Sequence, residues 1–290
     1  MNAANKAYSC LAVFVLSLMP FTARADSTKV SAKYQKWLEE DVACVITSVE
    51  RDVFSKLQTD RERDSFIEAF WKHRDPTPGT PENEFKTEHY RRLAYANQYL
   101  GRDAVGPGSR TDRGRMYILL GEPQDIERFN GIGIYQAEAW FYQGKTDLGL
   151  PAGFYLLFFK RRGQGVLKLY SPFADGPQAL MTGYDGDPTN YSKALSALKN
   201  IEPELATVSI SLVPGEESSV SGQPSMASDL LIQNIDAVPS RIVQSQYARK
   251  FLEYKDLVDV EYTANYIDNS SLIKVFKEPA TGMHFVHYAV

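Results

Sequence analysis

The stretch from Thr59 to Gly101 limits what this chain can fold into, because it joins two helix patterns through a rigid turn. Thr59 and Glu62 have the spacing of a capping box, in which a hydroxyl and a carboxylate each bind a free amide at a helix start. Thr47 and Glu50 have the same spacing before an earlier short helix. Three prolines between residues 76 and 81 then restrict the backbone. The stretch therefore predicts a pair of helices connected by a proline corner.

The ends of these two helices can also be predicted. The first is expected to stop at Asp75, because a residue that precedes proline is pushed out of the helical region. Thr80 is expected to cap the second, with Pro81 at its first position. Apolar residues then recur at spacings of three and four until Gly101 ends the helix. Each helix thus has one apolar face with which to pack.

Residues 1–25 have the pattern of a secretory signal peptide. Lys6 supplies a positive start, residues 10–21 form a short apolar run, and a small-x-small cleavage site ends at Ala25. The run is too short to span a bilayer, and no other stretch reaches about 18 apolar residues. We therefore expect an exported protein without a transmembrane segment, located in the periplasm or outside the cell after cleavage near Ala25.

Composition and charge narrow the class of protein. The chain is 43% hydrophobic and 12% aromatic, which is typical of a folded globular protein, and its 290 residues allow about two domains. A formal charge of −4 argues against a general electrostatic grip on nucleic acid, so no nucleic-acid partner is expected. Loss of the signal peptide leaves Cys44 as the single cysteine, and its apolar neighbours predict a buried thiol and not a nucleophile.

The pattern changes from helix to strand after a loop that is rich in Gly, Asp and Arg. Apolar runs bounded by turn residues predict four strands, at residues 116–120, 137–142, 153–160 and 166–170. Their short connections predict an antiparallel meander with the third strand at its centre. One face of this sheet is expected to be covered by the helix pair, so the fold class is α+β, with N-terminal helices packed on a short antiparallel β-meander.

The second half of the chain is interpreted as a linker and a further module. The linker, residues 173–203, is expected to contain a short helix from Tyr191 to Leu198. An amphipathic helix is expected from Ser240 to Tyr254. Strands are predicted at 208–212, 230–235, 258–262 and 284–290. These patterns predict a β-rich, sandwich-like C-terminal module over residues 204–290, and its end on a strand is consistent with truncation at that point.

Patterns for catalysis are missing from the sequence. The four histidines contain no His-Glu-x-x-His spacing, and His284 and His287 fall on opposite faces of a predicted strand. There is no Gly-x-Ser-x-Gly elbow and no glycine-rich phosphate loop. We therefore predict no catalytic residue, no metal site and no cofactor.

A cluster of charged residues follows the proline corner, the second helix and the loop into the first predicted strand. Its arginines can pair bidentately with its carboxylates. The favoured interpretation is a set of ion pairs that locks the helices to the sheet, and the alternative is a site for an anionic ligand. The cluster consists of Arg74, Asp75, Glu84, Glu88, His89, Arg91, Arg92, Asp112, Arg113 and Arg115.

Several of these residues lie in motifs that resemble the GWxTD-domain proteins, a family of exported bacterial proteins. The resemblance rests on Arg74-Asp-Pro-Thr-Pro-Gly-Thr80, on Glu88-His-Tyr-Arg-Arg92 and on the segment from Gly108 to Asp112, and it covers residues 37–170. Ser109 stands where the family has tryptophan. The family implies no catalytic residues, a domain over residues 30–172 and, in longer members, a β-rich module after it.

These observations predict a non-enzymatic cell-envelope protein that acts as a scaffold or through contacts with other envelope or surface proteins. The alternative is a hydrolase or an anionic-ligand-binding protein whose site contains Arg74, His89 and Asp112. If side chains fill the space around these charged residues and leave no pocket, the scaffold is favoured. A deep pocket that holds His89 and a carboxylate with a shifted pKa would favour the enzyme.

Overall fold

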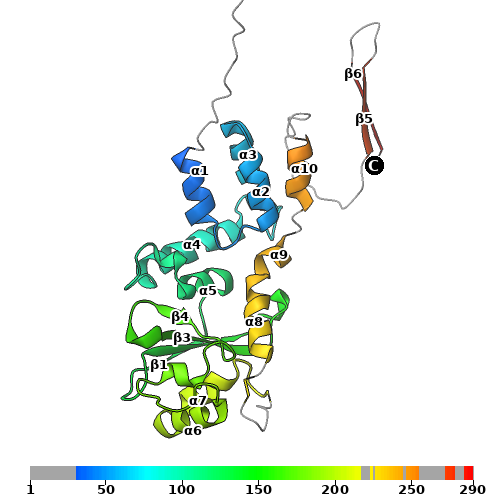
Figure 1. Cartoon of the computed structure of the whole chain (residues 1–290). Helices are drawn as coiled ribbons and strands as arrows, with labels where there is room; N and C mark the ends of the chain where they lie inside the picture. The colour runs from blue at the N-terminus through cyan, green and yellow to red at the C-terminus, as the bar shows by residue number, and fades with distance from the viewer. Residues whose placement is uncertain are drawn as a thin grey trace, which may run out of the picture. The chain divides into compact units, whose positions relative to one another are not determined.

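The structure, a computed structural model, combines helices with an antiparallel sheet in an α+β fold (Figure 1). It describes residues 31–216, 223–224, 226–243, 246–254, 272–277 and 284–289. The described elements belong to one compact unit that begins at Ser31. The predicted signal peptide and the strand predicted at 258–262 lie outside the described residues.

Three short helices open the described chain. They are α1 (Ala32–Lys36), which continues into a π-helical turn (Trp37–Asp41), α2 (Ser48–Lys56) and α3 (Asp60–Lys72). Both predicted capping boxes are confirmed, at the starts of α2 and α3. In each, a threonine hydroxyl accepts a hydrogen bond from a glutamate amide, and that glutamate side chain accepts one from the threonine amide.

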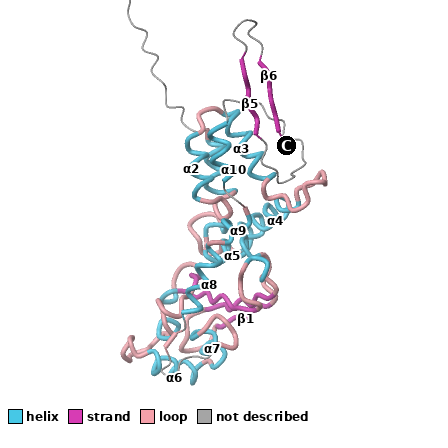
Figure 2. The backbone as a smooth tube through the Cα atoms, turned by 90° about the vertical axis from the view of Figure 1, so that its right-hand side faces the viewer, coloured by secondary structure: helices cyan, strands magenta, loops and turns pink. Residues whose placement is uncertain are grey.

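Aromatic side chains fill the space between these helices. Trp37 lies 5.0 Å from Phe54 and 5.2 Å from Phe70 between ring centroids, and all three rings are buried. Helix α10 (Gln246–Tyr254), from the other end of the chain, packs against α2 (Figure 2). Its Phe251 meets Phe66 edge to face at 5.5 Å. The N-terminal helices therefore form one aromatic core with a late segment of the chain.

Helix α4 (Glu84–Tyr99) begins later than predicted. The prediction that Thr80 caps it is wrong, because the Asn83 side chain accepts the hydrogen bond from the Lys86 amide at 2.8 Å. The Thr80 hydroxyl donates instead to backbone carbonyls of the corner and holds it as a turn. Asparagine can cap a helix in the same way as threonine. The side-chain amide of Asn83 also donates to the Trp71 carbonyl at 2.7 Å, which ties the start of α4 to α3.

The apolar run 116–120 is helical, so the prediction of a first strand there is wrong. It belongs to α5 (Asp112–Leu120), which begins where the Thr111 hydroxyl accepts a hydrogen bond from the Gly114 amide at 3.0 Å. Helix α5 packs on α4 and on β4, and all five residues of the run are buried. A helix covered on all sides has no polar stripe, so periodicity cannot separate it from a buried strand.

The sheet is the predicted antiparallel meander with a different first strand. Its order is β1 (Asp125–Phe129), β2 (Ala137–Gln143), β3 (Gly153–Lys160) and β4 (Leu167–Leu169). The last three match predicted strands, and β3 is an inner strand with buried side chains on both faces. Helix α5 covers one face, and α6 and α7 lie on the other (Figures 1 and 2). Helix α5, and not the predicted helix pair, is therefore the helix that packs on β4.

The region after the sheet is mainly helical where it is described. The helices are α6 (Tyr191–Ile201), α7 (Pro203–Ile210), α8 (Met226–Asp236), α9 (Val238–Ile242) and α10. Short 3-10 turns lie at Gly108–Arg110, Thr146–Leu148, Arg161–Gly163 and Pro177–Leu180. The predicted helix at Tyr191 is confirmed by α6. The helix predicted from Ser240 to Tyr254 is replaced by two helices, α9 and α10.

The strands predicted at 208–212 and 230–235 are wrong. The serine at 209 suggested a polar position between the apolar residues 208 and 210 of a strand. In α7 this serine is buried, and its hydroxyl donates to the Ala206 carbonyl of the same helix at 2.7 Å. In α8, Leu231 and Ile235 share the buried face at helical spacing while Leu230 is exposed. The described part of residues 204–290 adds one hairpin, β5 (Leu272–Lys277) with β6 (His284–Ala289), and does not show a sandwich.

Candidate functional site

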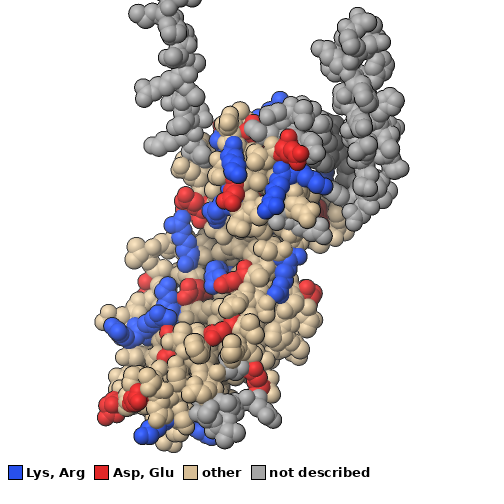
Figure 3. Space-filling model, turned by 45° about the vertical axis from the view of Figure 1, so that its right-hand side comes forward, with Lys and Arg blue, Asp and Glu red and all other residues tan. Residues whose placement is uncertain are grey.

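The ten charged residues predicted from the sequence fall into several separate contacts and not into one shared site. On the face shown in Figure 3, basic and acidic side chains alternate over neighbouring elements, so that neither sign forms a continuous field there. Most of these contacts join two elements that are distant in the sequence or shape a turn between them, and the ion pairs of Glu88 lie within α4. The favoured interpretation of the sequence, a set of ion pairs that locks the helices to the sheet, predicts contacts of this kind.

Arg74 and Glu50 form a buried, bidentate ion pair. The two guanidinium nitrogens lie 2.8 and 2.7 Å from the two carboxylate oxygens, and the side chains are 1% and 0% exposed. Arg74 also donates to the carbonyls of Phe70 and Val45 and lies over the Phe70 ring at 3.6 Å. The pair therefore fastens the end of α3 to the start of α2.

Glu50 is held as a carboxylate by its neighbours. Burial on its own raises the pKa of a carboxyl group, but hydrogen bonds from Arg74 and Tyr247 outweigh it and place the pKa of Glu50 below its ordinary value. The Tyr247 hydroxyl of α10 donates to Glu50 at 2.5 Å. The sequence identified Glu50 only as a helix cap, and nothing in its pattern pointed to these two partners.

Glu88 is shared by two arginines on the surface of α4. Its carboxylate lies 2.6 Å from Nε of Arg91 and 2.6 Å from Nε of Arg92. These hydrogen bonds, first of all the one from Arg91, lower the pKa of Glu88 to about 2. Arg92 also donates to the Ile118 carbonyl at 3.2 Å, near the last turn of α5. The group therefore joins α4 to the C-terminal end of α5.

Three candidates at the start of α5 each reach a different element. Asp112 accepts a hydrogen bond from a β4 amide at 2.8 Å. Arg113 pairs with the nearly buried Glu138 of β2 at 3.1 Å, and Arg115 pairs with Asp236 of α8. Helix α5 is thus anchored to both strands and to a helix from the second half of the chain.

The remaining acidic candidates shape the proline corner. Asp75 accepts a hydrogen bond from the Thr77 amide at 2.9 Å, and the exposed Glu84 accepts one from the Thr80 hydroxyl at 3.3 Å. Both contacts are local and stabilise the turn between α3 and α4.

The segment Gly108–Asp112 is the place where α4, α5 and the sheet meet. A Cβ atom on Gly108 would lie 1.9 Å from the Ala96 carbonyl oxygen, so this close approach requires glycine. Thr111 caps α5 and donates to the Gly108 carbonyl at 2.7 Å. Ser109 is buried, its amide donates to Asn97, and its hydroxyl has no hydrogen-bond partner within the part of the chain that the structure describes.

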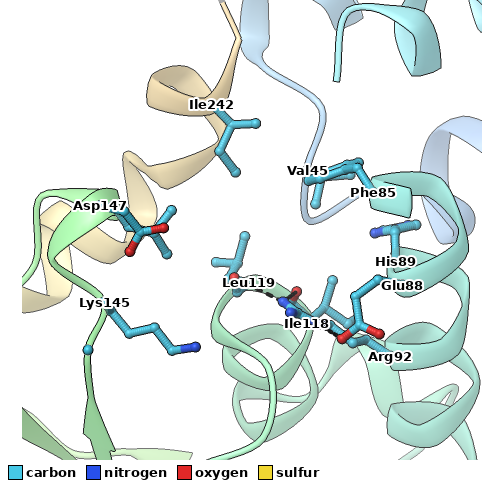
Figure 4. A pocket seen from close by; sticks show the side chains of 12 residues that line it. Val45, Phe85, Glu88, His89, Arg92, Ile118, Leu119, Lys145, Asp147 and Ile242 are labelled. Atoms are coloured by element: carbon cyan, nitrogen blue, oxygen red, sulfur yellow. Dashed lines mark hydrogen bonds and ion pairs between the residues drawn. The ribbon is translucent and has the colours of Figure 1, made fainter. Parts of the chain in front are cut away.

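A cavity of about 300 Å³ lies between α4, α5, the β2–β3 connection and α9 (Figure 4). Its volume is at the lower end of the range found for small-molecule sites. Three predicted site residues line it, namely Glu88, His89 and Arg92. Arg74 and Asp112 are not among its lining residues, so the cavity does not contain the three residues of the hydrolase hypothesis.

His89 is buried and its ring is engaged with the backbone. Its Nε2 lies 2.6 Å from the Asp41 carbonyl oxygen, and because a carbonyl oxygen only accepts, Nε2 must carry the hydrogen. Burial, helped by the charges of Arg74 and Arg92, lowers the pKa of His89 despite the opposing effect of this hydrogen bond. The imidazole is therefore neutral, and a neighbouring Glu88 with a pKa of about 2 is a weak base. This arrangement suits binding better than acid–base catalysis.

Lys145 is the cavity residue that sequence reasoning missed. It comes from the β2–β3 connection, is half-buried, and extends toward the cavity from the side opposite α4 (Figure 4). Across the described ranges, its Nζ makes no hydrogen bond and no ion pair. Its position in a short loop between two strands gave no signal in the sequence.

The described residues contain no group of three or more His, Cys, Asp or Glu side chains placed to hold a metal ion. No helix in the described part of the chain has the length and the apolar character of a membrane span.

The fold and the ion pairs together define a class: an α+β domain in which α5 links a helical N-terminal unit to an antiparallel meander. Residues 30–160 match the family model of the GWxTD domain, so the chain carries a GWxTD domain, as its motifs predicted. A search of curated proteins found no match. A search of solved structures found none either.

Proposed function

We propose that the chain is a non-catalytic protein of the cell envelope that acts through contacts with other envelope or surface proteins. In this proposal the pattern of residues 1–25 directs export, and cleavage near Ala25 releases the GWxTD domain and the helical region after it. The proposal rests on one structural observation, the engagement of the candidate charges with each other.

These charges are engaged in holding the fold together. A buried ion pair such as Arg74 with Glu50 has both partners satisfied, and neither is free to bind a substrate. Within the described residues, the candidates with a polar partner are Arg74, Asp75, Glu84, Glu88, His89, Arg91, Arg92, Asp112, Arg113 and Arg115. Charged residues that are paired in this way stabilise the fold. In this proposal the function is therefore carried by the exposed surface.

The outer surface offers apolar side chains that suit protein contacts. Met226 and Leu230 are one turn apart on α8 and are 75% and 53% exposed. Ile132 is fully exposed, and the neighbouring Gly133 lies against the half-exposed Ile201 of α6. Exposed apolar residues that gather on one element are typical of interaction surfaces.

The hydrolase alternative has less support. It requires Arg74, His89 and Asp112 to act on one substrate, whereas Arg74 is engaged with Glu50 and Asp112 with a β4 amide. The cavity beside His89 favours a role in ligand binding, which is a separate property from catalysis.

Export can be tested by expressing the full chain in a bacterial host and determining the N-terminal residue of the accumulated protein. We expect Asp26 at the start of protein recovered from the envelope or the medium. An intact Met1 in protein confined to the cytoplasm would contradict the proposal.

Protein contacts can be tested by chemical crosslinking in whole cells, comparing Leu230→Glu with Gln233→Glu. Both residues are exposed on α8 and both variants add one negative charge, so they differ only in the apolar side chain removed. We expect discrete crosslinked products that Leu230→Glu loses and Gln233→Glu keeps. Equal products from both variants would remove α8 as a contact surface, and the absence of any discrete product would contradict the proposed function.

A further inference from the structure

The cavity beside α4 contains one positive charge that the fold itself does not use. Arg92 and Glu88 are paired with each other, and Arg92 also binds the carbonyl of Ile118. His89 is neutral and binds a backbone carbonyl. Among the basic residues that line the cavity, Lys145 is the one without a hydrogen bond or ion pair in the described part of the chain. A half-buried ammonium group in this position favours an anion that comes from outside the chain.

The wall opposite this charge is apolar and fixed. Its side chains come from five segments, namely the turn before α2, α4, α5, the β2–β3 connection and α9, and include Val45, Phe85, Leu119, Leu148 and Ile242. All of these except Leu148 are labelled in Figure 4. The two segments that close the cavity are tied to each other, because Arg241 of α9 donates to the carbonyl of Leu148 at 2.8 Å and to that of Gly149 at 3.2 Å. The apolar wall is therefore a formed surface and does not depend on a ligand to assemble it.

Together these features define the ligand by its chemistry. We propose that the cavity binds an apolar molecule with a single carboxylate, in which the carboxylate pairs with Lys145 and the hydrocarbon part lies on the apolar wall. The exposed Asp147 lies at the edge of the cavity, so a second negative charge on the ligand would meet repulsion. The volume of about 300 Å³ holds roughly ten non-hydrogen atoms at the ~30 Å³ that one liquid water occupies.

This site goes beyond the proposed function, since it uses neither α8 nor the paired charges. Octanoate has the predicted size and charge, and 1-octanol is the matching neutral probe. Binding of both to the chain without residues 1–25 can be measured by isothermal titration calorimetry. We expect octanoate to bind at least about tenfold more tightly than octanol, because a hydrogen bond to a charged group is stronger than one to a neutral group.

Two lysine variants decide whether Lys145 supplies the recognition. Lys145→Met keeps the length of the side chain and removes the charge, and Lys199→Met makes the same change at an exposed lysine of α6 outside the cavity. We expect Lys145→Met to abolish the preference for octanoate over octanol and Lys199→Met to retain it. Lys145 has no partner to lose among the residues that the structure describes, so the variant is expected to unfold at the wild-type temperature.

A third variant, Ile242→Trp, fills the cavity and is expected to weaken both probes alike. Three results would overturn the proposal: equal affinity for octanoate and octanol, no saturable binding at millimolar octanoate, or an equal loss of octanoate affinity in Lys145→Met and Lys199→Met. If Ile242→Trp does not fold, the lysine pair decides the question alone.

Discussion

The ion pair between Arg74 and Glu50 gives the sharpest prediction, because it is the most deeply buried of the charged contacts. In Arg74→Met the Glu50 carboxylate, which is 0% exposed, keeps the hydroxyls of Thr47 and Tyr247 but loses the one countercharge that the described residues give it. Removing one partner of such a pair costs about 3–5 kcal/mol. At roughly 2–4 °C per kcal/mol for a domain of 150–250 residues, the unfolding temperature should fall by about 6–20 °C.

The assay is urea unfolding followed by tryptophan fluorescence, since Trp71 packs directly on Phe70 beside the ion pair. The double variant Arg74→Met with Glu50→Gln is expected to recover most of the lost stability, because no unpaired charge is then buried. Glu88→Gln serves as the control at a more exposed ion pair, with an expected loss of at most about 1 kcal/mol. A loss below about 1 kcal/mol in Arg74→Met would refute the reasoning.

Three further predictions concern a titrating pair, a helix cap and a close backbone approach. A hydrogen bond shared with Glu204 and, second, burial raise the pKa of Glu127 from 4.5 to about 7. Because the folded state favours the protonated carboxyl group, this group adds stability that is fully present below pH ~4.5 and is lost as the pH rises through about 7. Glu127→Gln should therefore flatten the dependence of unfolding temperature on pH between these values, and an unchanged slope would contradict the assignment. Asn83→Ala should cost about 1 kcal/mol in urea unfolding through loss of the α4 cap, and no change would show that the cap is dispensable. Gly114→Ala should cost about 1–3 kcal/mol or more, because its Cβ would lie 2.0 Å from a backbone oxygen, whereas Gly79→Ala, with open space around it, should be close to neutral in the same measurement. Equal effects of the two alanines would rule out the steric explanation.

Hydrogen bonds between residues that are close in the sequence can be predicted from the sequence alone. The capping boxes at Thr47 and Thr59 span three residues, and both form as predicted. The strands β2, β3 and β4 were bounded by turn residues and were also found. Thr80 has the residue type of a helix cap, but Asn83 caps α4. The Asn83 side chain also donates to the Trp71 carbonyl, which comes close to it only when the corner is folded.

The errors arise where burial on all sides removes the periodic signal. Residues 116–120 are covered by α4 on one side and by the sheet on the other, so their helix has no polar face to reveal it. In α7, Ser209 is polar and fully buried, which imitates the alternation of a strand. In both cases the tertiary environment, and not the local sequence, decides the secondary structure.

The candidate site was predictable in its residue types but not in its pairing. Arginines and carboxylates near the proline corner were expected to pair, yet the partner of Arg74 is Glu50, 24 residues earlier in the chain. Lys145 could not have been chosen at all, since its significance depends on α4, α5 and α9 meeting around it. Contacts of this kind follow from the three-dimensional arrangement of the elements.

We propose that the charged junction holds the fold together and does not carry out acid–base chemistry. It is tested most directly by a ¹⁵N NMR titration of the His89 ring in the chain without residues 1–25. We expect a neutral imidazole with its hydrogen on Nε2, because Nε2 faces the Asp41 carbonyl, and a pKa below the ordinary 6.5, because the ring is buried. A His89 that becomes protonated near pH 7 would contradict the account and restore the catalytic hypothesis.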